Sequence, residues 1–388
     1  MKDVVIVNKA NPWEGPLVAL LLVVFTGGIL GWNLLAPDQS FSEAENRSLK
    51  QLPAFSVHSL VTGKLATEVE KYVADQFAAR EFWVGLRSEV ESALGKVERH
   101  GVYLGRDGFL LQKFTPPAPG DAEAKAAAIQ AFADAVPSLR TYVMLVPTAQ
   151  SVLTDKLPPY VSGSGELAYR DEIRQLLDER IAFVDVYPAL TAQRKQAIFY
   201  KTDHHWTTKG AFYAYQTLAR QMGLEPQDEE DFRIETGSDA FYGSLYSKSG
   251  YRHVQPDSIE LYVPRAAQTY SVEFVDEQRQ SHSLYELDQL KRKDKYAVFL
   301  GGNHGLLHIR SDNQAKRKLL VVKDSYANSL LPFLVPHFAE IAVVDLRYYE
   351  GDVSRLAREQ QYSDMLLLYN VQTFAEDPSI LALAGQGQ

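Results

Sequence analysis

The sequence contains no cysteine among its 388 residues. Disulfide bonds and thiol catalysis are therefore excluded, and the absence fits an exported protein without demonstrating export. Positive charge is also in deficit: the chain has 40 Lys and Arg residues and 49 Asp and Glu residues, which gives a formal net charge of -9. A nucleic-acid partner would favour a basic face, so this class is disfavoured. We find no internal repeat, no long low-complexity tract and no nucleotide-binding loop, and we expect no cofactor.

Charged side chains are also missing from residues 16–37, PLVALLLVVFTGGILGWNLLAP. At 1.5 Å per residue, a helix of this length crosses the hydrocarbon core of a bilayer. A cleaved signal peptide is the alternative. Its one candidate cleavage point, after Ala36, is followed by Pro37 and preceded by the bulky Leu34, which matches a small-residue site poorly. We therefore predict an N-terminal tail over residues 1–15 and an uncleaved membrane anchor over 16–37.

A polar, proline-punctuated linker and a helical stalk are expected over residues 38–100. Apolar residues recur at helical spacing from about Lys64 to Glu81 and make one apolar face. The basic residues that flank the anchor on its two sides are nearly balanced, so charge alone does not give its orientation. We interpret this helix as a stalk that packs on the main domain.

The main domain is predicted over residues 101–388. A hairpin with a turn at Asp107-Gly108 opens it, and apolar strands then alternate with helices. This order indicates an α/β fold, with a parallel sheet covered by helices on both faces. The alternation breaks at about residues 224–302, where short antiparallel strands are expected as an insertion. Its aromatic and polar residues suit a carbohydrate platform and an ordinary β insertion equally well.

Two short stretches carry the chemistry, Thr202–Trp206 (TDHHW) and Lys323–Tyr326 (KDSY). A serine hydroxyl is a weak nucleophile, so it needs an imidazole to take its proton and a carboxylate to orient that imidazole. Asp203, His205 and Ser325 supply these groups. Ligand sites in parallel sheets lie beyond the carboxyl ends of the strands, where Pro147, Arg347 and Asn370 would also emerge.

Two other interpretations of the histidine pair stay open on the residues alone. His204 and His205 can be solvated loop histidines or a packed pair without catalytic function. A zinc site is the second alternative, but adjacent histidines point in different directions, the chain has no cysteine and no spaced third ligand stands out. We predict no metal site.

A series of motifs in sequential order carries a family resemblance. They are SEAENR, DQFAAR, VYLGRDGFL, TDHHWT, FYGSLY, LGGN, LLVVKDSYANSLLPFL, VDLRYY and LLLYNVQTF, from Phe41 to about Phe374. This series resembles the DHHW family, a membrane-anchored relative of the alginate O-acetyltransferases. The resemblance implies an extracytoplasmic, SGNH-hydrolase-like (flavodoxin-like) domain with a permuted motif order. Asp203 and His205 match the family's Asp-x-His element, and Ser325 matches its nucleophile.

The resemblance also implies an oxyanion hole. Asn370 is the positional match to the asparagine of that superfamily, while no glycine stands at the corresponding place after the VVDLRYY strand. Arg347 either replaces that glycine or binds substrate, and Tyr326 is grouped with these oxyanion and substrate-binding residues. Gly301–Asn303 are a rival hole that we interpret as a structural turn. His204 is expected to support the loop and Trp206 to pack.

The function implied by the resemblance is O-acetyl transfer to an exopolysaccharide or cell-wall glycan through an acetyl-serine intermediate. The acetyl donor would arrive through a multi-pass membrane acyl-transfer partner, and the catalytic domain of the single-pass protein would lie outside the membrane. Two alternatives remain on sequence grounds. One is a carbohydrate acetyl-esterase with the same triad, and the other is a non-catalytic glycan-binding assembly subunit.

Overall fold

The computed structural model describes residues 14–385, and it divides the chain into two compact units between Val90 and Glu91. The first unit contains the apolar helix α1 (Glu14–Leu35). Residues 15–35 of this helix are long and apolar enough to cross a membrane, a property shared by N-terminal signal sequences. The segment begins one residue before the start of the predicted anchor, at residue 15, and ends two residues before the anchor's end, at residue 35. Residues 1–13 of the predicted tail lie outside the described residues.

The remainder of the first unit consists of short strands and helices. β1 (Phe41–Ser42) pairs antiparallel with β2 (Arg47–Ser48), and α2 (Val57–Val61) and α3 (Lys64–Asp75) follow. The predicted helix from Lys64 to Glu81 is wrong at its C-terminal end, because α3 stops at Asp75 and α4 (Arg80–Ala93) begins anew.

Gln76, at the C-cap of α3, and Ala79 mark this break in the helix. The Gln76 amide donates to the backbone carbonyls of Gln39 and Lys50 at 2.8 and 2.9 Å. Ala79 then takes a positive φ of 53°. The positive φ of Ala79 ends the α-helical path, and the Gln76 side chain bonds to a segment distant in sequence. The helical spacing of apolar residues reports neither feature.

The second unit opens with a three-stranded antiparallel sheet. It consists of β3 (Glu98–Arg99), β4 (Val102–Leu104) and β5 (Leu110–Gln112). The predicted hairpin is confirmed, with Asp107 and Gly108 in its turn at φ values of 56° and 77°. Small turn residues adopt this left-handed conformation more easily than others do.

The main sheet has eight strands in the order β11-β10-β12-β14-β13-β15-β6-β7. Its parallel strands are β6 (Arg140–Val146), β7 (Ala182–Phe183), β13 (Lys318–Lys323), β14 (Glu340–Val344) and β15 (Asp364–Asn370). The predicted parallel sheet is therefore confirmed at its centre. The strands β10 (Tyr270–Phe274), β11 (Arg279–Ser281) and β12 (Leu306–Ser311) extend it antiparallel at one edge, so the whole sheet is mixed.

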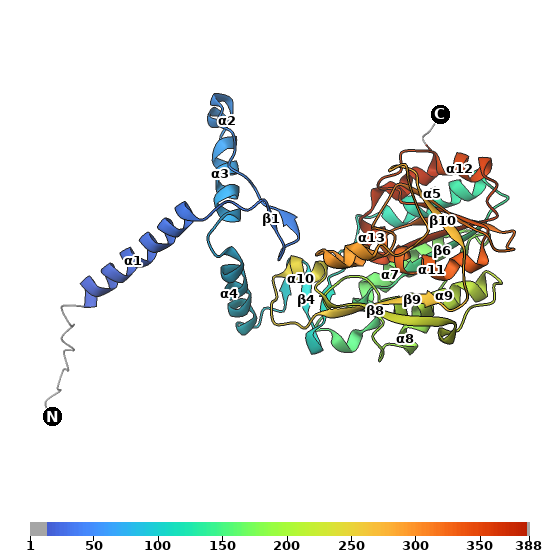
Figure 1. The fold of residues 1–388 in the computed structure, drawn as a ribbon, viewed down its shortest axis with the longest axis horizontal. Helices are drawn as coiled ribbons and strands as arrows, with labels where there is room; N and C mark the ends of the chain where they lie inside the picture. The colour runs from blue at the N-terminus through green and yellow to red at the C-terminus, as the bar shows by residue number, and fades with distance from the viewer. Residues whose placement is uncertain (1–13, 386–388) are drawn as a thin grey trace. The chain divides into compact units, whose positions relative to one another are not determined.

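Helices cover both faces of the sheet because alternate residues of each buried strand are apolar on opposite sides. One face packs against α5 (Asp121–Ala135), α7 (Ser164–Leu176), α12 (Val353–Glu359) and α13 (Val371–Glu376). The other packs against α6 (Ala149–Val152), α8 (Tyr187–Ala192), α9 (Thr208–Gln221) and α11 (Leu331–Leu334). Figure 1 shows α5 and α12 on one side of the sheet and α8 and α9 on the other.

The predicted insertion at residues 224–302 is β-rich in the structure. β8 (Phe232–Phe241) and β9 (Asp257–Pro264) form an antiparallel pair, visible as the long yellow-green ribbon in Figure 1, with α10 (Ser244–Ser249) between them in sequence. The second half of the insertion supplies β10 and β11 to the main sheet. Short 3-10 turns lie at Arg106–Gly108, Thr154–Lys156, Glu229–Asp231, Leu287–Lys291, Lys295–Val298, Ser325–Ser329, Val335–His337 and Pro378–Ala384.

Candidate active site

Ser325 begins a 3-10 turn directly beyond the carboxyl end of β13. Asp324 caps this turn, since its Oδ1 accepts a hydrogen bond from the Tyr326 backbone N–H at 2.9 Å. Its Oδ2 accepts from both the backbone and the side-chain nitrogen of Asn370, at 2.9 and 2.6 Å. Burial raises the pKa of Asp324 to about 6, although these N–H donors favour the carboxylate. The turn that carries Ser325 is thus tied to two adjacent strands of the sheet.

Asp203 and His205 lie on a short hairpin of residues 199–206. Phe199 and Trp206 form an antiparallel bridge at its base, and the Tyr200 N–H donates to the His205 carbonyl at 3.3 Å. The Asp257 carboxylate accepts from the backbone N–H groups of Lys201 and Thr202, both at 2.8 Å. These bonds fix the backbone on either side of Asp203.

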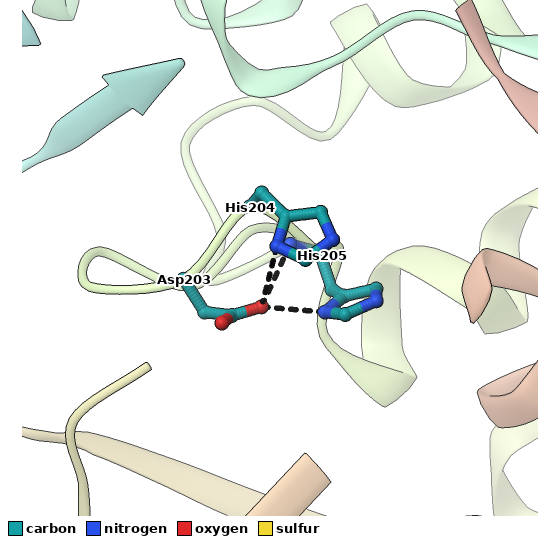
Figure 2. A group of neighbouring side chains, drawn as sticks. All are labelled: Asp203, His204 and His205. Carbon is teal, nitrogen blue, oxygen red and sulfur yellow. Dashed lines mark hydrogen bonds and ion pairs between the residues drawn. The ribbon is translucent and has the colours of Figure 1, made fainter. Parts of the chain in front are cut away.

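The structure brings the three predicted catalytic side chains into one line of contacts. His205 Nδ1 lies 2.5 Å from Asp203 Oδ1, and His205 Nε2 lies 2.7 Å from Ser325 Oγ. The His205 backbone N–H also donates to Asp203 Oδ1 at 3.0 Å, as Figure 2 shows. With the Nδ1 proton held by Asp203, Nε2 is free to accept the proton of the serine hydroxyl. This arrangement is chemically able to activate a serine nucleophile.

Asp203 is positioned by two residues that sequence reasoning did not select. The Ser244 backbone N–H donates to Asp203 Oδ2 at 2.7 Å. A Cβ atom on Gly243 would lie 2.3 Å from both Oδ2 and Cβ of Asp203, so only glycine leaves room for the carboxylate. Burial opposes ionisation of Asp203, but His204 and His205 outweigh it and hold the pKa well below its usual value. The only sequence signal for these two residues is the FYGSLY motif.

Tyr296 was also missed, and it supports His205 from the insertion. Its ring stacks on the His205 imidazole, with centroids 3.7 Å apart and planes 10° from parallel. Its hydroxyl donates to the Ser325 carbonyl at 3.1 Å and lies at the same distance from the Ser329 hydroxyl, with which it also forms a hydrogen bond. One tyrosine thus contacts both the predicted base and the backbone of the predicted nucleophile. Nothing in the sequence separates it from the other tyrosines of the chain, which number 21 in all.

The His204 ring also packs against the His205 imidazole, with centroids 3.8 Å apart. Its Nδ1 is 2.7 Å from Ser244 Oγ and 3.6 Å from Asp203 Oδ1. Burial and the neighbouring His205 lower the pKa of His204 to about 3, so its ring is neutral at pH 7. Figure 2 shows both imidazoles directed toward the same oxygen of Asp203.

The same three side chains form a possible metal cluster. Asp203, His204 and His205 each offer one ligand atom, and these atoms lie within 4.8 Å of one another. A cation bound there would have to break the 2.5 Å contact between Asp203 and His205. The geometry therefore favours proton transfer over metal coordination.

Trp206 and Tyr326 are both fully buried. The Trp206 indole N–H donates to the Tyr326 carbonyl and to Ser329 Oγ, each at 3.0 Å, as expected for a packing residue. The Tyr326 hydroxyl donates to the His204 carbonyl at 2.5 Å. The role of Tyr326 in binding substrate or an oxyanion stays a prediction; in the structure its phenol joins the serine turn to the hairpin in the protein interior.

Asn370 also has a structural role in place of the expected one. Its Nδ2 donates to Asp324 Oδ2 at 2.6 Å and to Thr373 Oγ1 at 2.7 Å, which uses both amide hydrogens. Its Oδ1 accepts from the Thr373 N–H and caps α13. No amide hydrogen of Asn370 remains for an oxyanion, so its geometry does not support the donor role predicted for it.

Arg347 follows the end of β14, and one edge of its guanidinium forms hydrogen bonds within the protein. Its Nε and Nη2 donate to the Asp345 carboxylate at 2.8 and 2.6 Å. The other terminal nitrogen, Nη1, has no hydrogen-bond partner among the described residues. The positive charge of Arg347 favours the ionised form of Asp324 and lowers the pKa of that carboxyl. Arg347 is thus oriented by one carboxylate while a second set of N–H groups remains available.

Asp345 is shared with a buried lysine. Lys323 Nζ lies 3.7 Å from Asp345 Oδ2 and donates to the side-chain oxygens of Asn303 and Asn328 at 2.8 and 2.7 Å. Burial lowers the pKa of Lys323 to about 8. Because Asn303 is occupied by this lysine, the Gly301–Asn303 segment fits the structural turn that the sequence suggested.

Comparison with known proteins shows the family to which this chain belongs. The sequence model of the DHHW protein family matches residues 125–344, more than half of the chain. The chain belongs to the DHHW protein family. Two curated relatives are named probable alginate O-acetylase AlgJ. The one from Pseudomonas aeruginosa is 27% identical over 228 residues, 54% of this chain and 52% of the relative. The one from Pseudomonas putida is 27% identical over 199 residues, 47% of this chain and 51% of the relative.

The chain spans about half the length of the curated relatives it matches. Solved structures resemble it over more of its length. A DHHW family protein from Eubacterium siraeum has a TM-score of 0.64 at 24% identity and covers 74% of this chain and 96% of its own. PatB1 from Bacillus cereus, solved with a sulfonyl adduct, has a TM-score of 0.62 at 20% identity and covers 73% and 98%. These likenesses confirm the SGNH-like α/β fold of the DHHW protein described here.

Proposed function

We propose that this DHHW protein is an extracytoplasmic O-acetyltransferase that acetylates hydroxyl groups of an exopolysaccharide or cell-wall glycan. The single observation that carries the proposal is the contact series from Ser325 Oγ through His205 to Asp203. The names of the AlgJ relatives supply the reaction type, since they are probable O-acetylases of a polysaccharide. A serine activated in this way transfers acyl groups through a covalent intermediate.

In the first half-reaction, Ser325 Oγ attacks the carbonyl carbon of the acetyl donor. The hydroxyl proton passes to His205 Nε2, and Asp203 stabilises the imidazolium that forms. The tetrahedral intermediate then expels the donor's leaving group, which takes the proton from His205. The product of this half-reaction is acetyl-Ser325.

In the second half-reaction, a sugar hydroxyl attacks the acetyl carbonyl of the intermediate. His205 Nε2 removes the proton of that hydroxyl and returns it to Ser325 Oγ as the ester bond to serine breaks. The acetylated sugar then leaves and the site is restored. With water as acceptor, the same steps release acetate, and the protein would be an acetyl-esterase.

The oxyanion of both tetrahedral intermediates is assigned in this proposal to Arg347 and the Ser325 backbone N–H. Arg347 is held by Asp345 through one edge only, so its Nη1 can donate to a developing negative charge. Loss of one oxyanion donor typically costs about 3 kcal/mol of transition-state stabilisation. Arg347 would then take the place that the sequence analysis gave to Asn370.

The chain's own residues account for proton transfer without a cofactor in this mechanism. The acetyl group would be delivered by a multi-pass membrane acyl-transfer protein. α1 would act as a single-pass membrane anchor, which keeps the second unit at the outer surface of the cell membrane near that partner.

The test uses the full chain in detergent micelles with a chromogenic acetyl ester. Release of the chromophore and an acetyl adduct detected by intact mass are expected for the native protein, and Ser325→Ala should lose both. Ser164→Ala, at the exposed start of α7, is the matched control and should keep both. Addition of oligosaccharides then separates the two acceptors, because acetylated sugar indicates transfer and acetate alone indicates hydrolysis. A folded native chain that binds glycan but neither releases chromophore nor gains mass would contradict the proposal and indicate a binding subunit.

A further inference from the structure

A cavity of about 690 Å³ opens at the base of the 199–206 hairpin. This volume falls within the range of small-molecule binding pockets. Phe199, Tyr200 and Lys201 line it from the hairpin, while Asp203 and His205 lie further along the same hairpin. The function described above makes no use of this cavity.

The charge of the cavity wall differs in sign from that of the chain. The lining contains five cationic side chains and four carboxylates, a formal balance of +1, in a protein of net charge -9. The cations are Lys156, Arg194, Lys195, Lys201 and Lys209, and the carboxylates are Asp107, Asp155, Asp257 and Glu260. An anion is thus better matched to this cavity than to the average surface of the protein.

Several of these charges are already engaged inside the protein. Lys156 Nζ lies 2.6 Å from Asp107 and 3.2 Å from Asp155. The Asp257 carboxylate accepts three hydrogen bonds from the backbone of Lys201 and from the backbone and hydroxyl of Thr202. Three of the four lining carboxylates therefore have internal partners and repel an incoming anion less than free carboxylates would.

Three cations in the cavity have no carboxylate partner among the described residues, namely Arg194, Lys195 and Lys201. Arg194 and Lys195 are exposed at the rim, and Lys201 Nζ lies 5.5 Å from the centre of the Phe109 ring. Arginine binds carboxylate and phosphate groups in a bidentate fashion, and lysine binds them as a point charge. Glu260, also in the lining, can accept hydrogen bonds from hydroxyl groups.

We propose that this cavity is a binding subsite for an anionic sugar. Arg194, Lys195 and Lys201 receive its carboxylate or phosphate, Glu260 accepts its hydroxyls, and Phe109 offers an apolar surface to the ring. The inference rests on the proposed function in one respect, that the sugar belongs to the glycan that is acetylated. The subsite would thus define the substrate class as an acidic glycan and bind it beside the hairpin that carries Asp203 and His205.

The test measures binding to the full chain in detergent micelles by isothermal titration calorimetry. The probes are an oligogalacturonate, a phosphorylated mannan oligosaccharide and a neutral cello-oligosaccharide of equal length. We expect at least one anionic probe to bind tenfold or more tightly than the neutral one, with an affinity that falls as salt rises. The two anionic probes distinguish a carboxylate from a phosphate as the recognised group.

The decisive variant is Arg194→Ala/Lys195→Ala, which removes two rim charges without breaking an ion pair among the described residues. Its affinity for the preferred anionic probe should fall tenfold or more, while release of chromophore from the neutral acetyl ester should not change. Lys316→Ala/Arg358→Ala removes the same number of charges from exposed positions outside the cavity and should bind as the native chain does. Lys201→Gln tests the cavity wall independently and should also weaken binding.

Equal binding of anionic and neutral probes, or native affinity in both cavity variants, would overturn the inference. The ester assay keeps the two proposals apart. A native chain that shows no ester release but retains variant-sensitive anion binding would refute the proposed function alone. Ester release with no selective anion binding would refute the subsite alone.

Discussion

Gly243 gives the sharpest test of how the structure positions Asp203. An alanine Cβ at this position would lie 2.3 Å from Asp203 Oδ2, whereas ordinary contacts begin at 3.4 Å. The backbone of Gly243 has φ -82° and ψ -165°, a conformation open to any residue. Gly243→Ala therefore perturbs the site through steric contact and not through backbone strain.

The size of the effect follows from that contact. The carboxylate must move by about 1 Å to relieve it, and it is held by the Ser244 N–H on one oxygen and by His205 on the other. A displacement of about 1 Å in a catalytic arrangement can lower the rate about 100-fold. Each factor of ten corresponds to about 1.4 kcal/mol, so we expect a loss of about 2.7 kcal/mol in transition-state stabilisation.

The assay is kcat on the chromogenic acetyl ester, with thermal unfolding measured on the same samples. We expect kcat of Gly243→Ala to fall about 100-fold, because the imidazole of His205 loses its fixed orientation. Gly165→Ala in α7 is the control, since its Cβ would meet its nearest atom at an ordinary 3.7 Å and alanine favours the helix. A folded Gly243→Ala protein with native kcat would refute the idea that this close approach sets the geometry of Asp203.

Two further predictions concern the buried charges beside Ser325. The folded-state pKa of Asp324, about 6, lies above the usual unfolded value of about 3.9, so its contribution to stability is complete below pH 4 and is lost as pH rises to 6. Asp324→Asn cannot titrate, and from pH 4 to pH 7 its unfolding free energy should gain about 2 kcal/mol relative to the native chain; parallel pH profiles in chemical denaturation would contradict this. Lys323→Met leaves the Asp345 carboxylate buried without its lysine, and denaturation at pH 7 should show a loss of about 3 to 5 kcal/mol. A loss below about 1 kcal/mol would show that Arg347 alone compensates Asp345.

Most of the architecture was predictable from the sequence because the central strands are continuous apolar runs. The segments KLLVVK, EIAVV and DMLLLYN are buried on both faces, and this pattern indicates a parallel sheet directly. The edge strands β10 and β11 carry no such signal, since they are mixed in polarity and half exposed. β10 joins the main sheet through long-range pairing with β12, which local patterns do not encode, and β11 joins it by pairing with β10.

The candidate site was predictable where its chemistry depends on residue type. Asp203, His205 and Ser325 were selected by the needs of a serine nucleophile, and the structure places them in contact. The residues that position them were not predictable in this way. Gly243 acts by having no side chain, and Tyr296 acts by stacking, so both depend on packing that only the folded chain creates.

The hydrogen-bond partners of Asn370 were not predictable for a related reason. Its position at the end of β15 was predicted correctly, but the use of its amide hydrogens was not. Two local acceptors, Asp324 and Thr373, take both hydrogens. The position of a residue after a strand therefore predicts whether it reaches the site. Which acceptors take its N–H hydrogens depends on neighbouring side chains, and the sequence alone does not show where these lie.

The position of β13 in the main sheet has a consequence for synthesis of the protein. β13 pairs on both sides with strands that follow it in the chain, β14 and β15. The turn at Ser325 is tied to Asn370, the last residue of β15, and His205 lies 120 residues before that serine. Ribosomes add about 5 to 20 residues per second, so the hairpin with Asp203 and His205 is made several seconds before its serine is fixed in place. A nascent chain that ends before Asn370 would therefore lack the assembled site, and Ser325 is fixed beside His205 only as the sheet is completed.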